Sequence, residues 1–227
     1  MVAAVAALLL IVVAPVVIQG GLLADEYIIC LRPIHDGGYG PYLHAIWRDT
    51  GVVRPARFIE LLLISKTCTS VPYGLVILVP LALKFTAGFL LYGLLRDLRV
   101  SRPWPEIGIA LWLLEPLGTE AALWPAALHV LLGLVLGLAA LRLYRRGSLG
   151  WAALASLGAA LSVEQVIFAL PVAVWLTSPR ELRSRATLVV TGVVAVVILA
   201  YAIRPGENER QALTLAERWH ADRKSVV

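Results

Sequence analysis

Two adjacent carboxylates, Asp25 and Glu26, are the residues of this chain best placed to do chemistry. They follow an uncharged apolar segment, 3–23, and open a polar stretch over 24–70. A carboxylate at such an edge reaches water, so it stays charged, and it still meets a substrate carried in lipid. We therefore predict a functional site at the membrane edge. The alternative is that both acids simply end a helix at the interface.

The composition favours a membrane protein. Apolar residues make up 59% of the 227, and charged residues only 15%. A soluble domain does not need that much apolar surface. The formal net charge of +5 comes from arginines clustered between apolar spans, which is a topogenic pattern. We expect membrane lipid as a partner and no nucleic acid.

The apolar segments predict an all-α, polytopic transmembrane protein with six or seven membrane segments. We expect a transmembrane core over 1–203, with an outer loop over 24–70, and a polar C-terminal tail over 204–227. The expected segments are 2–22, 71–95, a short one at 105–114, 120–143, a stretch 149–176 that is broken into two shorter helices, and 186–203. The second would be about 37 Å long as a helix, ample for the hydrocarbon core.

Serine-led turn patterns mark two of the expected helix starts. Ser178-Pro179-Arg180-Glu181 reads as a capping box with proline at the first helical position. Ser162-Val163-Glu164-Gln165 is a second capping-box pattern. It predicts that a new helix starts inside the stretch 149–176.

Arginine clusters at every second turn predict the orientation. They are Arg96, Arg99 and Arg102, then Arg142, Arg145 and Arg146, then Arg180, Arg183 and Arg185. Such turns are cytoplasmic, so the loop 24–70 and the turns near Glu120 and Glu164 face outward. The acidic sites Asp25-Glu26, Glu115 with Glu120, and Glu164 are then expected on one membrane face.

Several motifs in this order resemble GT-C membrane glycosyltransferases, especially the protein O-mannosyltransferase and transmembrane-TPR mannosyltransferase branches. The segment LALKFTAGFLLYGLLRDL resembles the second-helix pattern of that family. Pro116, Glu120 and Trp124 match the spacing of its "P-x-x-x-E-x-x-x-W". LSVEQVIFALP is similar to the family's helix break, Asp25-Glu26 to its acidic dyad, and Arg54-Pro55 to a frequent "RP" in the first loop.

The resemblance covers about residues 1–203, with departures. The usual histidine and asparagine of the second helix are Lys84 and Ala87 here. The polar residues that often follow the tryptophan are apolar, apart from His129. Family members are also longer, so the resemblance implies the N-terminal part of such an enzyme, or a truncated form of one.

The resemblance implies transfer of a hexose from a polyprenyl-phosphate donor to an acceptor hydroxyl on a protein, lipid or glycan at the outer face. The implied catalytic residues are Asp25, as the base, and Glu26 beside it. The donor phosphate needs cations. The substrate-binding candidates are Arg54, Arg57, Lys84, Glu120 and Glu164. No cofactor is implied beyond the lipid-linked donor, and no metal-ligand cluster is present in the sequence.

Each binding candidate also has a structural interpretation. Arg54 and Arg57 suit a loop solvated at the lipid headgroups. Lys84 lies mid-helix, where charge costs roughly 3 kcal/mol, and it can pair with Glu115 or snorkel to the interface. For Glu120 and Glu164, the first turn of a helix favours a carboxylate through the macrodipole.

The sequence also allows other functions, and it leaves the pairing of the two cysteines undecided. A small polytopic transporter or lipid-handling protein would use the same intramembrane charges as a pathway, and a non-catalytic fragment would keep only the fold. Cys30 and Cys68 could pair if their loop is extracytoplasmic, or be two isolated apolar residues. We expect a multi-pass protein of a bacterial plasma membrane.

Overall fold

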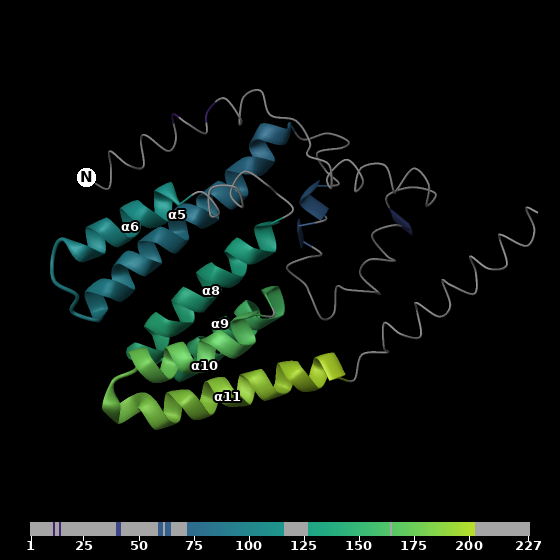
Figure 1. Ribbon diagram of the computed structural model, residues 1–227. Coiled ribbons are helices and arrows are strands. Elements are labelled where there is room, and N and C mark those ends of the chain that lie inside the picture. Colours follow the sequence, from purple (N-terminus) through teal and green to yellow (C-terminus); the bar gives the residue numbers. More distant parts are fainter. Residues whose placement is uncertain are drawn as a thin grey trace, which may run out of the picture.

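The computed structural model describes residues 72–115, 127–163 and 165–202, and short pieces of the earlier chain: 11, 14, 40–41, 59–60 and 62–64. Over these residues every regular element is a helix, which confirms the all-α prediction. The helices are α5 (Tyr73–Asp97), α6 (Trp104–Leu114), α8 (Leu128–Arg145), α9 (Leu149–Ser162), α10 (Gln165–Thr177) and α11 (Arg180–Ala202) (Figure 1).

Three of these helices are long and apolar enough to cross a membrane. The spans are Gly74–Asp97, Leu128–Arg145 and Arg180–Ala200. Large apolar side chains also face outward on several helices, among them Phe89, Leu111, Phe168 and Leu188, all more than 60% exposed. Lipid covers such a surface without the cost that water would impose. The chain is therefore a membrane protein.

The helix bounds agree with two of the predicted segments and differ at two others. The segments expected at 71–95 and 105–114 correspond to α5 and α6. The segment expected at 120–143 is α8, which begins only at Leu128 and ends at Arg145. The helix expected at 186–203 begins earlier, at Arg180. Arginine is a good helix former, and its long side chain reaches water from the first turns, so the basic run is helical too. The first expected segment, 2–22, and the tail 204–227 lie outside the described residues, apart from Ile11 and Ala14.

The predicted break inside 149–176 is confirmed. It falls at Val163, which is extended (φ −141°, ψ 119°) between α9 and α10. Pro171 lies inside α10 and does not mark the break. As helices of 14 and 13 residues, α9 and α10 are each about 20 Å long, shorter than a hydrocarbon core of about 30 Å.

Helices begin at both predicted places, Gln165 and Arg180, but the Ser178 hydroxyl makes no capping bond among the described residues. The Ser162 hydroxyl donates a hydrogen bond of 2.7 Å to the Gly158 carbonyl, back into its own helix. Serine often bonds the carbonyl four residues earlier, and that contact competes with capping the next helix. The Ser178 hydroxyl is buried.

The six helices of the described residues pack side by side and build the core, with α5 and α8 parallel and α8 and α9 antiparallel (Figure 1). α8 packs against α5 and α9, α5 against α6, and α11 against α9 and α10. The largest buried cluster takes residues from five helices: Leu94, Ala140, Leu141, Tyr144, Ala152, Leu170, Val174, Ala186 and Val190. Tyr144 is fully buried there and accepts a hydrogen bond of 3.3 Å from the Ser156 hydroxyl.

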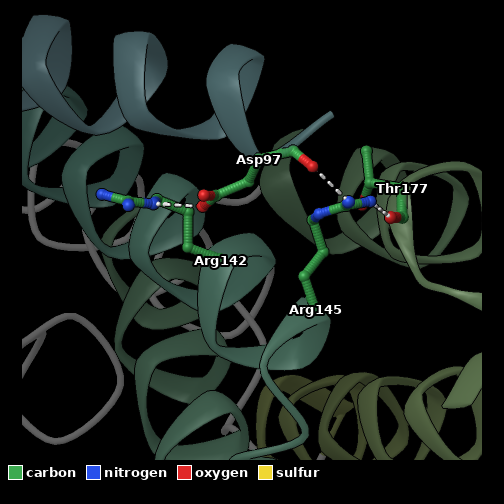
Figure 2. A network of polar contacts seen from close by, with 4 residues as sticks. All are labelled: Asp97, Arg142, Arg145 and Thr177. Atoms are coloured by element: carbon green, nitrogen blue, oxygen red, sulfur yellow. Dashed lines mark hydrogen bonds and ion pairs between the residues drawn. The ribbon is translucent and has the colours of Figure 1, made fainter. Parts of the chain in front are cut away.

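A polar network holds three helix ends together where the arginines collect (Figure 2). Arg142 Nε donates to the Asp97 carboxylate at 2.9 Å. The Arg145 guanidinium donates to two backbone carbonyls, that of Asp97 at 2.6 Å and that of Thr177. The C-terminal ends of α5, α8 and α10 therefore meet. The three arginine clusters share one end of the bundle, as the alternation of the clusters predicted.

Two helices at this end are each followed by a residue in the left-handed backbone conformation. One is a glycine and the other an arginine, so we expect substitutions at them to change the free energy of unfolding in opposite directions. Gly147 (φ 76°) follows α8 and Arg99 (φ 60°) follows α5. In each case an amide one residue later bonds the carbonyl five residues before it, Ser148 to Leu143 and Val100 to Leu95, both at 3.0 Å. This is the pattern of a Schellman motif, which favours glycine.

We expect Gly147→Ala to lower the free energy of unfolding by about 1 kcal/mol, because a β-carbon is strained at that φ. Arg99→Gly should raise it by about 0.5 kcal/mol, since relief of strain outweighs the added freedom of the unfolded chain. Reversible unfolding in mixed detergent micelles measures both. Effects of the same sign would contradict this account of the two caps.

Candidate functional site

A buried lysine in the middle of α5 is the most unusual polar residue of the described helices. Lys84 is 0% exposed. Its ammonium lies 5.7 Å from the centre of the Trp112 ring and 3.4 Å from the carbonyl oxygen of Glu115. The Trp112 indole N–H also donates to the Lys84 carbonyl at 3.1 Å. The ammonium is thus held by an aromatic face and a carbonyl, both supplied by α6 and its end.

The length of α6 explains why these groups meet. From Lys84 to the end of α5 the chain descends about 20 Å, and the 11 residues of α6 return it by about 16 Å. α6 therefore ends at the depth of Lys84 and not at the far edge of the membrane. Gly88 lets the two helices approach, because a β-carbon there would lie 3.1 Å from the Trp112 ring.

Of the interpretations open for Lys84, pairing with Glu115 fits this geometry, and snorkelling does not. A snorkelling ammonium would extend to the interface, whereas Lys84 is enclosed. The enclosed ammonium and Glu115 form an ionisable pair inside the span, which is where a membrane protein keeps ionisable groups for function.

A second buried polar pair lies at the start of α8. Glu60 is fully buried, and one of its carboxylate oxygens accepts the His129 backbone N–H at 3.2 Å. The same oxygen lies 2.5 Å from the His129 ring nitrogen Nδ1. A carboxylate at this place also meets the positive end of the helix dipole. The pair can bind and release a proton, because imidazole and carboxylate share one hydrogen bond.

The two polar sites lie away from the arginine-rich end. α8 ends at that end, at Arg145, so its first turn with His129 and Glu60 lies about 24 Å away. Lys84 lies 13 residues before the end of α5, about 20 Å from the arginines. If the arginine turns are cytoplasmic, Glu60 and His129 lie toward the outer face.

Most of the residues predicted for the site lie outside the described residues. They are Asp25, Glu26, Arg54, Arg57, Glu120 and Glu164, and also Cys30 and Cys68. Their convergence on one membrane face stays a prediction. Lys84 is the predicted site residue that the structure describes. In the described parts of the chain, no group of three or more His, Cys, Asp and Glu residues is arranged to hold a metal ion.

Sequence reasoning missed Glu60 as a candidate. The signal was present in FIELLLI, where one carboxylate stands inside a short apolar run. A charge in such a run is either exposed at a helix edge or buried against a partner. Only the fold shows that His129, 69 residues later, is that partner.

These two buried polar pairs have to be interpreted from their own chemistry. A scan against protein-family models and searches of curated proteins and of solved structures find no match to this chain.

Proposed function

We propose that this chain is the membrane-embedded, N-terminal part of a GT-C-like glycosyltransferase. It would transfer a hexose from a polyprenyl-phosphate donor to an acceptor hydroxyl at the outer face of a bacterial plasma membrane. The proposal includes six or seven membrane segments, of which the described helices are the later ones. Asp25 would take the acceptor's proton, with Glu26 beside it, and Arg54 and Arg57 would contact the donor phosphate.

The buried charge of Lys84 is the observation that carries this proposal. A polyprenyl-phosphate presents its anion at the membrane, and the departing phosphate gains negative charge as the sugar leaves. An ammonium inside the span stabilises that charge strongly, because little water screens it. Trp112 beside it offers an aromatic face of the kind that suits apolar chain or sugar rings.

The Glu60–His129 pair supports the same function, because it suits the acceptor half of the reaction. Transfer to a hydroxyl releases a proton, which needs an acceptor and a path to water. A carboxylate hydrogen-bonded to a partly exposed imidazole provides both near the start of α8. Glu120 and Glu164 would then serve the substrate at the neighbouring turns.

We expect Asp25→Asn to lower hexose transfer by about a hundredfold or more, because the amide cannot take the acceptor's proton. The measurement is transfer of labelled hexose by membranes that carry the full-length protein, with Glu181→Gln, a change at an exposed acid in the first turn of α11, as the control. Unchanged transfer in Asp25→Asn would count against the assigned base.

A transporter is the second candidate, and the α9–α10 hairpin favours it. α9 begins four residues after Arg145, and α10 ends at Thr177, which Arg145 contacts, so the hairpin enters and leaves at one end. Short helices that meet at an extended residue inside a membrane occur in transporters. Flux of substrate into proteoliposomes without any lipid-linked sugar would support transport, and dependence on the donor would support transfer.

A further inference from the structure

The arginine-rich end of the bundle contains buried hydrogen-bond donors that no protein group satisfies. They are Arg145 Nε, Ser178 Oγ, Arg183 Nε and Thr187 Oγ1. All four atoms can donate, and two belong to guanidinium groups, which only donate. Buried polar groups in native proteins are normally paired, so a set of four in one region points to a missing acceptor.

These donors come from elements that pack together. Arg145 donates to the carbonyl of Thr177, the residue before Ser178. Arg183 and Thr187 are one turn apart on α11 and flank Ala186, which packs in one core cluster with Tyr144 and Val174. Tyr144 precedes Arg145, and Val174 lies one turn before Ser178. The end of α8, the α10–α11 turn and the first turns of α11 therefore bring the four donors to one region.

The charges of this region favour an anion. Arg145 is bound to neutral carbonyls, while the nearby Asp97 carboxylate is taken by Arg142 (Figure 2). The Arg183 guanidinium stacks on the Trp175 ring at 5.1 Å, which leaves the donors at its edge available. Among the described residues, no carboxylate forms an ion pair with Arg145 or Arg183.

Ser178 is the residue that distinguishes a specific binding site from a surface that is only positively charged. Ser178 is only 3% exposed, and its hydroxyl, two residues before the start of α11, has no partner among the described residues. A helix start adds its own N–H groups and positive dipole to such a site. Exposed arginines at a membrane surface would attract anionic lipid anywhere, whereas a buried hydroxyl requires a bound oxygen at one place.

We propose that the arginine-rich end binds a phosphate-bearing anion between α8, the α10–α11 turn and α11. The guanidinium groups of Arg145 and Arg183 and the hydroxyls of Ser178 and Thr187 donate to the phosphate oxygens. The site lies at the end of the bundle opposite to Glu60 and His129, so it is independent of the proposed sugar transfer. The anion is either the headgroup of an anionic phospholipid or a soluble phosphate.

The test uses the full-length protein in nanodiscs of phosphatidylcholine alone, or with phosphatidylglycerol added, and titration with inorganic phosphate. Binding is measured by the shift in thermal unfolding and by native mass spectrometry of bound lipid. Stabilisation by phosphatidylglycerol that inorganic phosphate does not reproduce identifies a lipid headgroup. Saturable stabilisation by inorganic phosphate in phosphatidylcholine identifies a soluble anion. If neither phosphatidylglycerol nor inorganic phosphate stabilises the protein, the proposal is wrong.

Two variants and one control distinguish a site from a diffuse surface potential. Arg183→Gln should weaken binding roughly tenfold or more, the effect of losing a charge-assisted hydrogen bond to the anion. Arg185→Gln removes the same charge from the same helix on an exposed face away from the cluster, and it should weaken binding by about fivefold at most, the effect of one charge near a membrane surface. If the two variants lose the same amount of binding affinity, only net charge matters, and the proposed site is wrong.

Ser178→Ala tests the buried hydroxyl itself. Without ligand the variant should unfold at an equal or higher temperature, because it removes an unsatisfied polar group. The same variant should bind the anion several-fold more weakly, since one donor is lost. A variant that binds as tightly as the parent would overturn the role of Ser178, and with it the built site.

Discussion

Replacing Lys84 by methionine is expected to lower hexose transfer by about a hundredfold or more while leaving the helices intact. The ammonium would no longer stabilise the departing phosphate, an effect of the size seen when a preorganised charge is removed from a site. Methionine has a similar length and no charge. The free energy of unfolding should fall by about 3 kcal/mol at most, because Glu115 loses its partner while the cost of burying the ammonium also disappears.

Two further measurements show whether Lys84 acts on the donor. Lys84→Arg keeps the charge in a bulkier, planar group against Trp112, so it should retain more activity than Lys84→Met. Binding of undecaprenyl phosphate, measured by quenching of tryptophan fluorescence, should weaken in Lys84→Met in parallel with transfer. If Lys84→Met loses activity only because the protein unfolds, Lys84 is a structural residue. Unchanged binding of the donor would lead to the same conclusion.

The helical layout was predictable from sequence because a bilayer imposes simple rules. Apolar runs of sufficient length have to be helices, since their backbone groups find no water. The break at Val163 was predictable as well, because 149–176 is long and carries polar residues at its middle. The Ser178-Pro179-Arg180-Glu181 pattern predicted the start of α11 to within one residue, although the apolar segment alone was placed at 186–203 because the arginines before it are charged.

The polar pairs were only partly predictable, since each depends on residues distant along the chain. Lys84 stands out in sequence as a charge inside an apolar run, but its contact with Trp112 depends on the length of α6 and on Gly88. Serine patterns predicted helix starts near Ser162 and Ser178 that the structure contains, but the Ser178 hydroxyl makes no capping bond among the described residues, and the Ser162 hydroxyl donates back to Gly158. A serine at a helix end has several acceptors within reach, and tertiary packing decides between them.

Glu60→Ala is expected to lower the free energy of unfolding by about 3 kcal/mol. The change removes a charge-assisted hydrogen bond to the His129 ring and a carboxylate at the start of α8, contributions of about 1.5–3 and about 1 kcal/mol. The measurement is unfolding in mixed micelles, with Glu181→Ala as the matched control, because Glu181 is an exposed acid in the first turn of another helix.

A double-mutant cycle separates the pair from its surroundings. Glu60→Ala, His129→Ala and the double variant should show a coupling of about 1–3 kcal/mol, because the two side chains share one short contact. Glu60→Gln should fall between the parent and Glu60→Ala, since an amide oxygen still accepts the His129 backbone N–H but carries no charge. Additive effects within about 0.5 kcal/mol would show that Glu60 acts on the helix start alone, and that His129 is not its partner.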